Sequence, residues 1–180
     1  MAAPVTERTR SRVESSIADL RGEYGEFETI DKMWEHAPER YRRVRERADE
    51  EALGGAGVWL TNADGAVLLV RNEGDEGWGD PGGKREREET YREAARRELR
   101  EETGVECEIT GVLEVHVIEH RSVETDDPPV FDLIVIFAGE YAGGEPRARD
   151  GEIADVGWFS EPPSTVLYDE VATRPFGDGA

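Results

Sequence analysis

Residues 78–105, WGDPGGKREREETYREAARRELREETGV, decide the fold and raise the question of what seven closely spaced glutamates do. Thr90, followed three residues later by Glu93, forms a capping box, which predicts a helix that begins at Tyr91. Gly104 supplies the residue type that most often ends a helix. We therefore expect a glycine-rich loop, a helix and a sharp stop in this segment.

Three of the glutamates lie on the side of this helix that we expect to be packed. At about 100° per residue, Tyr91, Ala95 and Leu99 form one apolar stripe. Three carboxylates lie within an arc of about 100° that overlaps and adjoins this stripe: Glu98, Glu101 and Glu102. Three arginines point the other way: Arg92, Arg96 and Arg100. A solvated charge run would instead place its acidic residues opposite the packed stripe.

These crowded carboxylates require a positive partner, because like charges three and four positions apart repel each other. Arg97 can pair with Glu93 or Glu101, but one guanidinium cannot neutralise three carboxylates that face a cleft. A hard divalent cation can, since Mg²⁺ takes oxygen ligands and usually retains waters and substrate phosphates. The helix is therefore expected to carry a metal site.

The spacing of this segment resembles the 23-residue signature of the Nudix hydrolase family. All nine specified positions match: Gly83, Glu89, Arg97, Glu98, Leu99, Glu101, Glu102, Gly104 and Val105. The resemblance extends over residues 54 to about 172. It implies an α/β (α+β) fold, a Nudix-type α/β/α sandwich with a mixed sheet, preceded by a helical N-terminal arm. Asp80 and Glu88 depart from the commonest form of the loop without falling on a signature position.

The resemblance also implies a role for each matched residue. The ligands of Mg²⁺, or of Mn²⁺, would be the Gly82 carbonyl and three side chains: Glu98, Glu101 and Glu102. Glycine suits position 82, because a main-chain oxygen must approach the ion closely and because such a turn can require a positive φ. Arg97 would orient a carboxylate together with Glu89. The catalytic set is then Glu98, Glu102, Arg97 and one further base.

The general base is a helix glutamate in some members of the family and a glutamate from a later loop in others. Two candidates precede the late strand that contains Trp158, namely Glu152 and Glu145. Glu152 is followed by the apolar Ile153, which should anchor it against the core, whereas Glu145 lies in a turn rich in glycine and proline. A base must stay within hydrogen-bond reach of its water, so Glu152 is favoured.

The implied activity is a metal-dependent pyrophosphohydrolase that cleaves the diphosphate of a nucleoside diphosphate linked to another moiety, by water attack on phosphorus. One alternative is a non-catalytic Nudix-type sensor domain that binds a nucleotide and uses the arm as its output. A second is an isoprenoid diphosphate isomerase, for which the surroundings of Cys107 lack the expected context. Trp78, Arg71 and Phe131 are candidates for base or phosphate contacts, although packing is the simpler role.

The chain divides near Leu53, into a helical extension, 1–53, and a Nudix domain, 54–180. In the extension one helical stripe is formed by Val13, Ile17, Leu20 and Tyr24. A second helical pattern passes through Met33, Trp34 and Ala37. Pro38 is expected to open a third helix, whose stripe is Tyr41, Val44 and Ala48. These stripes must be buried, either against the main domain or in a homodimer. The extension is expected to pack rather than to take part in chemistry.

After residue 53 the pattern becomes that of strands. Residues 57–61 and 66–71 are expected to form a pair joined by a turn at Asp64 and Gly65. Two long β-rich stretches follow at 105–120 and 130–143. A short strand at 156–159 precedes a last helix near 164–172.

The composition limits where the protein works and what it binds. The 180 residues carry 42 acidic and 22 basic side chains, a net charge of −20, and residues 51–180 contribute −18 of it. Broad nucleic-acid binding is therefore not expected. An apolar run long enough for a membrane span or a signal peptide is lacking, so we expect a soluble, cytoplasmic protein. Two lysines against 20 arginines and the large acidic excess favour a halophilic, salt-rich cytoplasm, with a GC-rich genome as the alternative.

The remaining candidate ligands are few. The only cysteine, Cys107, excludes an internal disulfide. Three histidines, at positions 36, 116 and 120, are too far apart in the sequence to be predicted as a ligand set.

Overall fold

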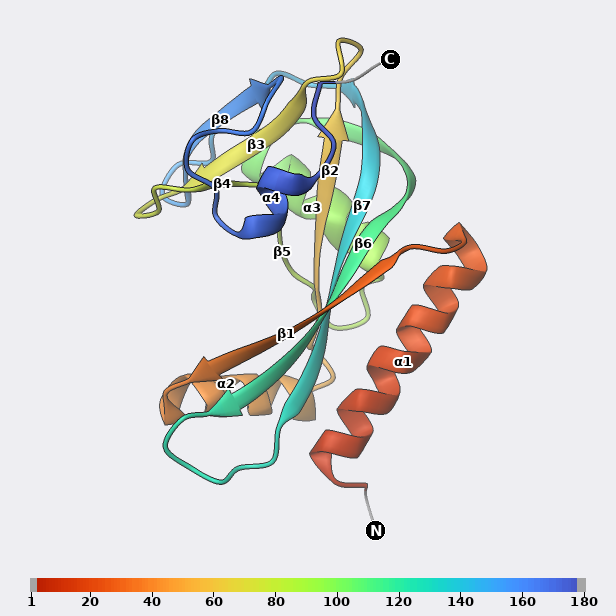
Figure 1. Cartoon of the computed structure of the whole chain (residues 1–180), viewed down its shortest axis with the longest axis vertical. Helices are drawn as coiled ribbons and strands as arrows, with labels where there is room; N and C mark the ends of the chain where they lie inside the picture. Colours follow the sequence, from red (N-terminus) through yellow and green to blue (C-terminus); the bar gives the residue numbers. More distant parts are fainter. Residues whose placement is uncertain (1–2, 178–180) are drawn as a thin grey trace.

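The computed structural model describes residues 3–177, in which helices and strands alternate only as far as β2, and most of the remaining elements are strands (Figure 1). The elements are, in order, α1 (Val5–Tyr24), β1 (Glu28–His36), α2 (Pro38–Asp49), β2 (Gly55–Thr61), β3 (Val67–Asn72), β4 (Trp78–Gly79), β5 (Gly82–Lys84), α3 (Tyr91–Thr103), β6 (Glu106–Ser122), β7 (Val130–Gly143), β8 (Ile153–Phe159) and α4 (Asp169–Thr173).

The strands form one mixed sheet in the order β1-β6-β7-β2-β3-β4, with β5 added to β2 and β8 added to β3. β1 is parallel to β6, and β2 is parallel to β7. The long antiparallel pair of β6 and β7 runs through the whole molecule and connects its two ends (Figure 1). The predicted strands after residue 53 are confirmed, and β7 covers the predicted 130–143.

Apolar residues cover both faces of the sheet, so the molecule has three layers. On one face the core joins α1 and α3 to the sheet through Leu20, Leu99 and Phe137. On the other face Val171 of α4 packs with Trp59, and both belong to a second buried cluster. The α/β/α sandwich with a mixed sheet is therefore confirmed.

The apolar stripe of α1 packs against this chain's own sheet. Val13 and Leu20 are buried in the main core, and Ile17 and Tyr24 pack against it. Of the two expected ways to bury the stripe, packing on the main domain is the one observed. A homodimer stays a prediction.

The expectation of a helix through Met33 and Trp34 is wrong, because residues 28–36 form the strand β1. This strand occupies the edge of β6, which is 17 residues long and offers backbone groups that would otherwise lack partners. Met33 and Trp34 are among the exposed large apolar side chains, so no helical stripe is buried here. The sheet therefore crosses the proposed boundary at residue 53, and that boundary stays a prediction.

The last helix is shorter than expected. α4 spans only Asp169–Thr173, and residues 164–168 are not helical. Val166 instead forms a β-bridge with Trp78, and a backbone bond joins Leu167 N to the Trp78 carbonyl at 2.8 Å. This pairing holds the segment extended, which overrides the local helix signal. Between residues 3 and 177, no helix combines the length and apolar character needed to cross a bilayer.

Candidate active site and family

The helix α3 begins and ends where its sequence signals lie. Thr90 Oγ1 accepts a hydrogen bond from Glu93 N at 3.1 Å, and Glu93 Oε2 accepts one from Thr90 N at 2.8 Å, which confirms the capping box. Gly104 has a left-handed conformation with φ 71° and forms the C-cap. The helix therefore holds its side chains at fixed positions over β2 and β5.

The packed side of α3 carries carboxylates as well as apolar groups. Ala94, Ala95 and Leu99 are fully buried, and Glu98 and Glu102 are only 9% and 4% exposed. Three arginines on the other side are exposed, as predicted: Arg92, Arg96 and Arg100. Glu101 is also exposed, so two of the three carboxylates enter the packed face.

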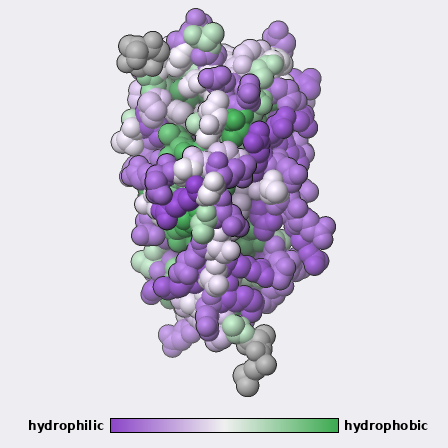
Figure 2. All heavy atoms as spheres, turned by 90° about the vertical axis from the view of Figure 1, so that its right-hand side faces the viewer, coloured by the Kyte–Doolittle hydropathy of each residue, from purple (hydrophilic) through white to green (hydrophobic). Residues whose placement is uncertain are grey.

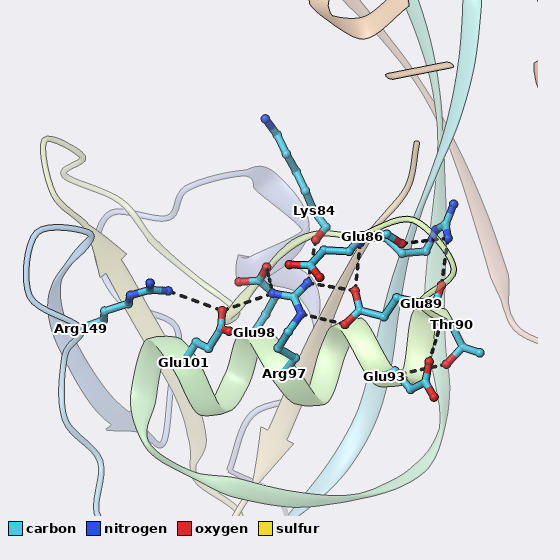
Figure 3. Close-up of polar contacts among 10 residues, drawn as sticks. Lys84, Glu86, Glu89, Thr90, Glu93, Arg97, Glu98, Glu101 and Arg149 are labelled. Carbon is cyan, nitrogen blue, oxygen red and sulfur yellow. Dashed lines mark hydrogen bonds and ion pairs between the residues drawn. The ribbon is translucent and has the colours of Figure 1, made fainter. Parts of the chain in front are cut away.

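Arg97 joins three of the glutamates (Figure 3). Its guanidinium donates to Glu89 through Nε at 2.7 Å and Nη2 at 3.0 Å, and its Nη1 donates to Glu98 Oε1 at 2.8 Å. Glu101 Oε2 lies 3.2 Å from the same Nη1. The hydrogen bonds from Arg97 lower the pKa of Glu89. Arg97 is thus placed to orient carboxylates.

The glycine loop touches both buried glutamates. Gly82 N donates to Glu102 Oε2 at 3.0 Å. A Cβ at Gly82 would lie 2.5 Å from the Ala56 carbonyl oxygen, so glycine is needed here for close approach to β2. Gly82 does not have a positive φ, and that part of the expectation is wrong. The loop's positive φ lies at Glu88 instead, at 69°.

Burial makes both carboxylates resist ionisation. It raises the pKa of Glu98, with Arg97 opposing the shift. It also raises the pKa of Glu102 to about 8, which the amide of Gly82 opposes and the charges of Glu98 and Glu152 reinforce. Two carboxylates held together in a site of low dielectric constant are stabilised in their charged form by a cation.

The donor set at this site fits a hard divalent cation, because it consists of carboxylates and main-chain oxygens. In the arrangement seen for residues 3–177, no three His, Cys, Asp or Glu side chains are grouped closely enough to hold one ion. Arg97 binds Glu98 and Glu101 in this arrangement, and Arg149 lies 3.5 Å from Glu101. Metal binding would require these side chains to turn from the arginines.

The loop before β8 brings Glu152 to the same site. Arg149 Nη1 lies 3.2 Å from Glu152 Oε2, and Ile153 is 2% exposed, as its anchoring role requires. The loop is tied to the end of α3, since Arg149 N donates to the Glu102 carbonyl at 3.1 Å. Glu145 is exposed. The sequence carries no signal for Arg149, which depends on how the loop meets the helix end.

A buried ionic network supports the loop from the other face of the sheet. Arg174, 6% exposed, donates to Asp80 Oδ1 at 2.8 Å and to Glu114 Oε1 at 2.9 Å. Tyr168 bonds to Asp80, and His116 Nε2 lies 2.8 Å from Glu114 Oε1. Asp80 is the residue that departs from the commonest loop sequence, and its buried arginine partner accounts for it. The charge pattern of the sequence does not mark Arg174 as a buried member of this network.

A cleft of about 1070 Å³ lies on this face. Gly82 and Gly83 form part of its wall and also contact the two buried glutamates, whereas the side chains of Glu98, Glu101 and Glu102 do not line it. Trp78, Arg71 and Phe131, the candidates for base or phosphate contacts, do not line it. Arg71 pairs with Asp155, and Trp78 packs against Phe159.

Two of the histidines are neighbours despite their separation in sequence. His36 Nε2 lies 2.8 Å from His120 Nδ1, and the two rings stack. Parallel pairing of β1 with β6 brings them together, which the expected helix would not have done.

Comparison with known proteins agrees with this geometry. The model of the NUDIX domain matches residues 53–164. A protein of Bacillus subtilis (strain 168) named "Putative 8-oxo-dGTP diphosphatase" is 31% identical over 106 residues, which cover 59% of this chain and 65% of that protein. The chain thus matches just under two thirds of this relative's length.

Solved structures also share the fold. The MutT NUDIX hydrolase from Burkholderia pseudomallei is 25% identical, with a TM-score of 0.52 over 67% of this chain and 94% of its own. A UDP-X diphosphatase is 20% identical, with a TM-score of 0.52 over 76% of this chain and 75% of its own. Because the family model covers well over half of the sequence, this chain belongs to the Nudix hydrolase family.

Proposed function

We propose that the protein is a metal-dependent pyrophosphohydrolase, which cleaves the diphosphate of a nucleoside diphosphate linked to another moiety. The observation that carries this proposal is the packing of two buried carboxylates, Glu98 and Glu102, against the Gly82–Gly83 loop. Buried like charges at this spacing are unfavourable unless a cation joins them. Structural reasons alone would favour apolar residues at these positions.

Mg²⁺ or Mn²⁺ is the proposed cofactor, held by the Gly82 carbonyl and by carboxylates of α3: Glu98, Glu101 and Glu102. When bound, the ion supplies neutralisation of the diphosphate charge and acidification of a water. Arg97 keeps Glu98 oriented and shares Glu101 with Arg149. These arginines provide the positive charge that holds the carboxylates in place before the substrate arrives.

Glu152 is the proposed general base. Its carboxylate takes the proton of the attacking water, the water oxygen forms a bond to phosphorus, and the bond to the leaving phosphate oxygen breaks. Two observations support this choice over Glu145. Glu152 is close enough to affect the pKa of both Glu98 and Glu102, and Ile153 fixes its backbone.

The names of the similar proteins agree with a phosphoanhydride substrate. One is named for hydrolysis of 8-oxo-dGTP and another for hydrolysis of a UDP derivative. Both names describe a nucleoside joined through a diphosphate linkage.

A test of the activity is release of a nucleoside monophosphate from a panel of nucleoside diphosphate derivatives, with Mg²⁺ and with a chelator. Release that depends on Mg²⁺ supports the hydrolase. Tight nucleotide binding without turnover under both conditions would instead indicate the non-catalytic sensor domain. The presence of all four signature glutamates in this chain argues against that alternative.

We also propose that the protein works in a salt-rich cytoplasm. Hydrophilic residues cover most of the face that carries α1, and hydrophobic residues show there only in patches (Figure 2). The net charge of −20 on a chain of this size would cause strong self-repulsion in dilute buffer. Salt at about 1 M shortens the Debye length to about 3 Å and thereby screens most of this self-repulsion.

A further inference from the structure

The cleft bordered by Gly82 and Gly83 concentrates positive charge in a strongly acidic protein. Five basic side chains line it: Lys32, Arg40, Arg43, Arg47 and Lys84. Both lysines of the chain are among them, and Lys32 is paired with Glu170 at 2.9 Å. Of the three acidic residues on its wall, Asp80 is already paired with Arg174. The cleft is therefore the place where an anionic ligand is least repelled by the rest of the surface.

Three of these cations come from one face of α2. Arg40, Arg43 and Arg47 follow at spacings of three and four, which place them on the same side of the helix. From the first to the last, the row extends about 10 Å at 1.5 Å per residue. A row of this length along a cleft wall offers several guanidinium groups to one extended ligand.

The guanidinium groups keep donors free for such a ligand. Among residues 3–177, Arg40 forms no ion pair with a carboxylate. Arg43 pairs with Glu39 at 2.9 Å, but both side chains are more than 70% exposed, and such a surface pair is weak. Arg47 uses Nη2 for the Ala52 carbonyl at 2.6 Å, which fixes its position and leaves other donors.

The row and the glycine loop line one continuous cavity. Gly82 and Gly83, which touch Glu102 and Glu98, line the same cleft as the α2 arginines. Figure 3 shows the Lys84 side chain directed away from α3. At about 1070 Å³ the cleft reaches the upper end of the range for small-molecule sites, about 300 to 1,000 Å³, so it can hold more than a diphosphate.

We infer that the arginine row of α2 binds a phosphate group of the substrate that lies outside the scissile diphosphate. Guanidinium groups bind phosphate through paired, charge-assisted hydrogen bonds, which explains arginine at all three positions. The N-terminal extension then forms part of the substrate site, beyond its packing role. The inference rests on the proposed function only in naming the ligand as substrate, since binding to the row can be measured without turnover.

Binding of inorganic tripolyphosphate to the full chain tests the row directly. Titration calorimetry in EDTA compares wild type with Arg40→Gln, Arg43→Gln and Arg42→Gln. Arg42 is the matched control, because it is exposed on the same helix but does not line the cleft. We expect Kd to rise about tenfold in each of the first two variants and to stay unchanged in the third. Equal Kd in all four proteins, or an equal loss in Arg42→Gln, overturns the inference.

Two substrate pairs then identify the source of the phosphate. ADP-ribose and its 2′-phosphate differ by a phosphate on the sugar, and diadenosine diphosphate and tetraphosphate differ in the length of the phosphate chain. For one of these two pairs, the KM of the wild-type protein should be about tenfold lower for the compound with more phosphate than for its partner compound. Arg40→Gln and Arg43→Gln should remove that difference in KM, whereas the control Arg42→Gln should keep it. If the arginines affect neither pair, the inference is wrong.

Failure of the proposed function and failure of the inference about the arginine row give different results. Without hydrolysis of any compound, the proposed function fails, while the tripolyphosphate titration still decides on the row. With hydrolysis but no effect of the arginines on binding or KM, the function stands and the row is a solvated face.

Discussion

The carboxylate of Glu98 fills the space that a side chain at Gly83 would need. A Cβ at Gly83 would lie 2.6 Å from Glu98 Cδ, much closer than the usual carbon contact of about 3.5 to 4.0 Å. Glycine at this signature position is therefore required by the neighbouring carboxylate, since its own φ is not positive.

Gly83→Ala is expected to displace Glu98 while leaving the fold intact. A shift of about 1 Å in a catalytic group can lower the rate about 100-fold, so kcat should fall by that order. The control is Gly22→Ala in α1, where a Cβ meets nothing within 4 Å and should add about 0.5 to 1 kcal/mol of stability. Unchanged kcat in Gly83→Ala would show that the carboxylate is not needed where it lies.

Removing either buried charge should stop turnover without unfolding the protein. Glu98→Gln and Glu102→Gln keep the side-chain volume but lose a metal ligand, and kcat should fall by roughly 10² to 10⁴. Steady-state kinetics with saturating Mg²⁺ measure the loss of turnover, and the circular dichroism spectrum shows whether the fold is intact. Glu88→Gln, exposed and outside the signature, should behave as wild type. Near-normal turnover in either of the first two variants would refute the assignment.

The metal-free protein should lose stability as the pH rises from about 4.5 to about 8. Burial raises the pKa of Glu102 to about 8 from an ordinary value of 4.5, so the folded state binds more protons than the unfolded state in this window. The free energy of unfolding therefore falls with pH, and the contribution is complete below the unfolded pKa and lost above the folded one. Urea titrations in EDTA across this range measure the slope.

Glu102→Gln provides the control for this pH dependence, because glutamine does not titrate. The variant should be more stable than wild type at pH 8 in EDTA and should show a shallower slope. An identical slope in both proteins would mean that Glu102 ionises normally in the folded state.

How far the sequence predicts this structure differs between local and long-range features. The start and end of α3 depend on Thr90, Glu93 and Gly104, which act within one turn of the helix, and both were predicted. β1 was missed because its place depends on the edge of β6, about 85 residues further along the chain. The same holds for Arg174, whose partner Asp80 is 94 residues away and gives no periodic signal.

The charge of the protein leads to a prediction about salt. If the −18 of residues 51–180 reflects a saline cytoplasm, screening should raise the melting temperature well past physiological ionic strength. Differential scanning calorimetry between dilute buffer and about 1 M KCl measures this. NaCl should have the same effect, because screening depends on ionic strength. A flat or falling melting temperature would favour an ordinary acidic protein.

The comparison of Glu152 with Glu145 tests the general base. Glu152 shares Arg149 with Glu101 of α3, and its backbone precedes the buried Ile153, so its carboxylate stays near the proposed water. A base that keeps this position contributes about 10² to 10⁴ in rate, and Glu152→Gln should lose that factor in kcat at saturating Mg²⁺ with little change in KM. Glu145→Gln, exposed in the same loop, is the matched control and should keep full activity. A large loss in Glu145→Gln alone would reverse the assignment, whereas full activity in both variants would place the base on α3.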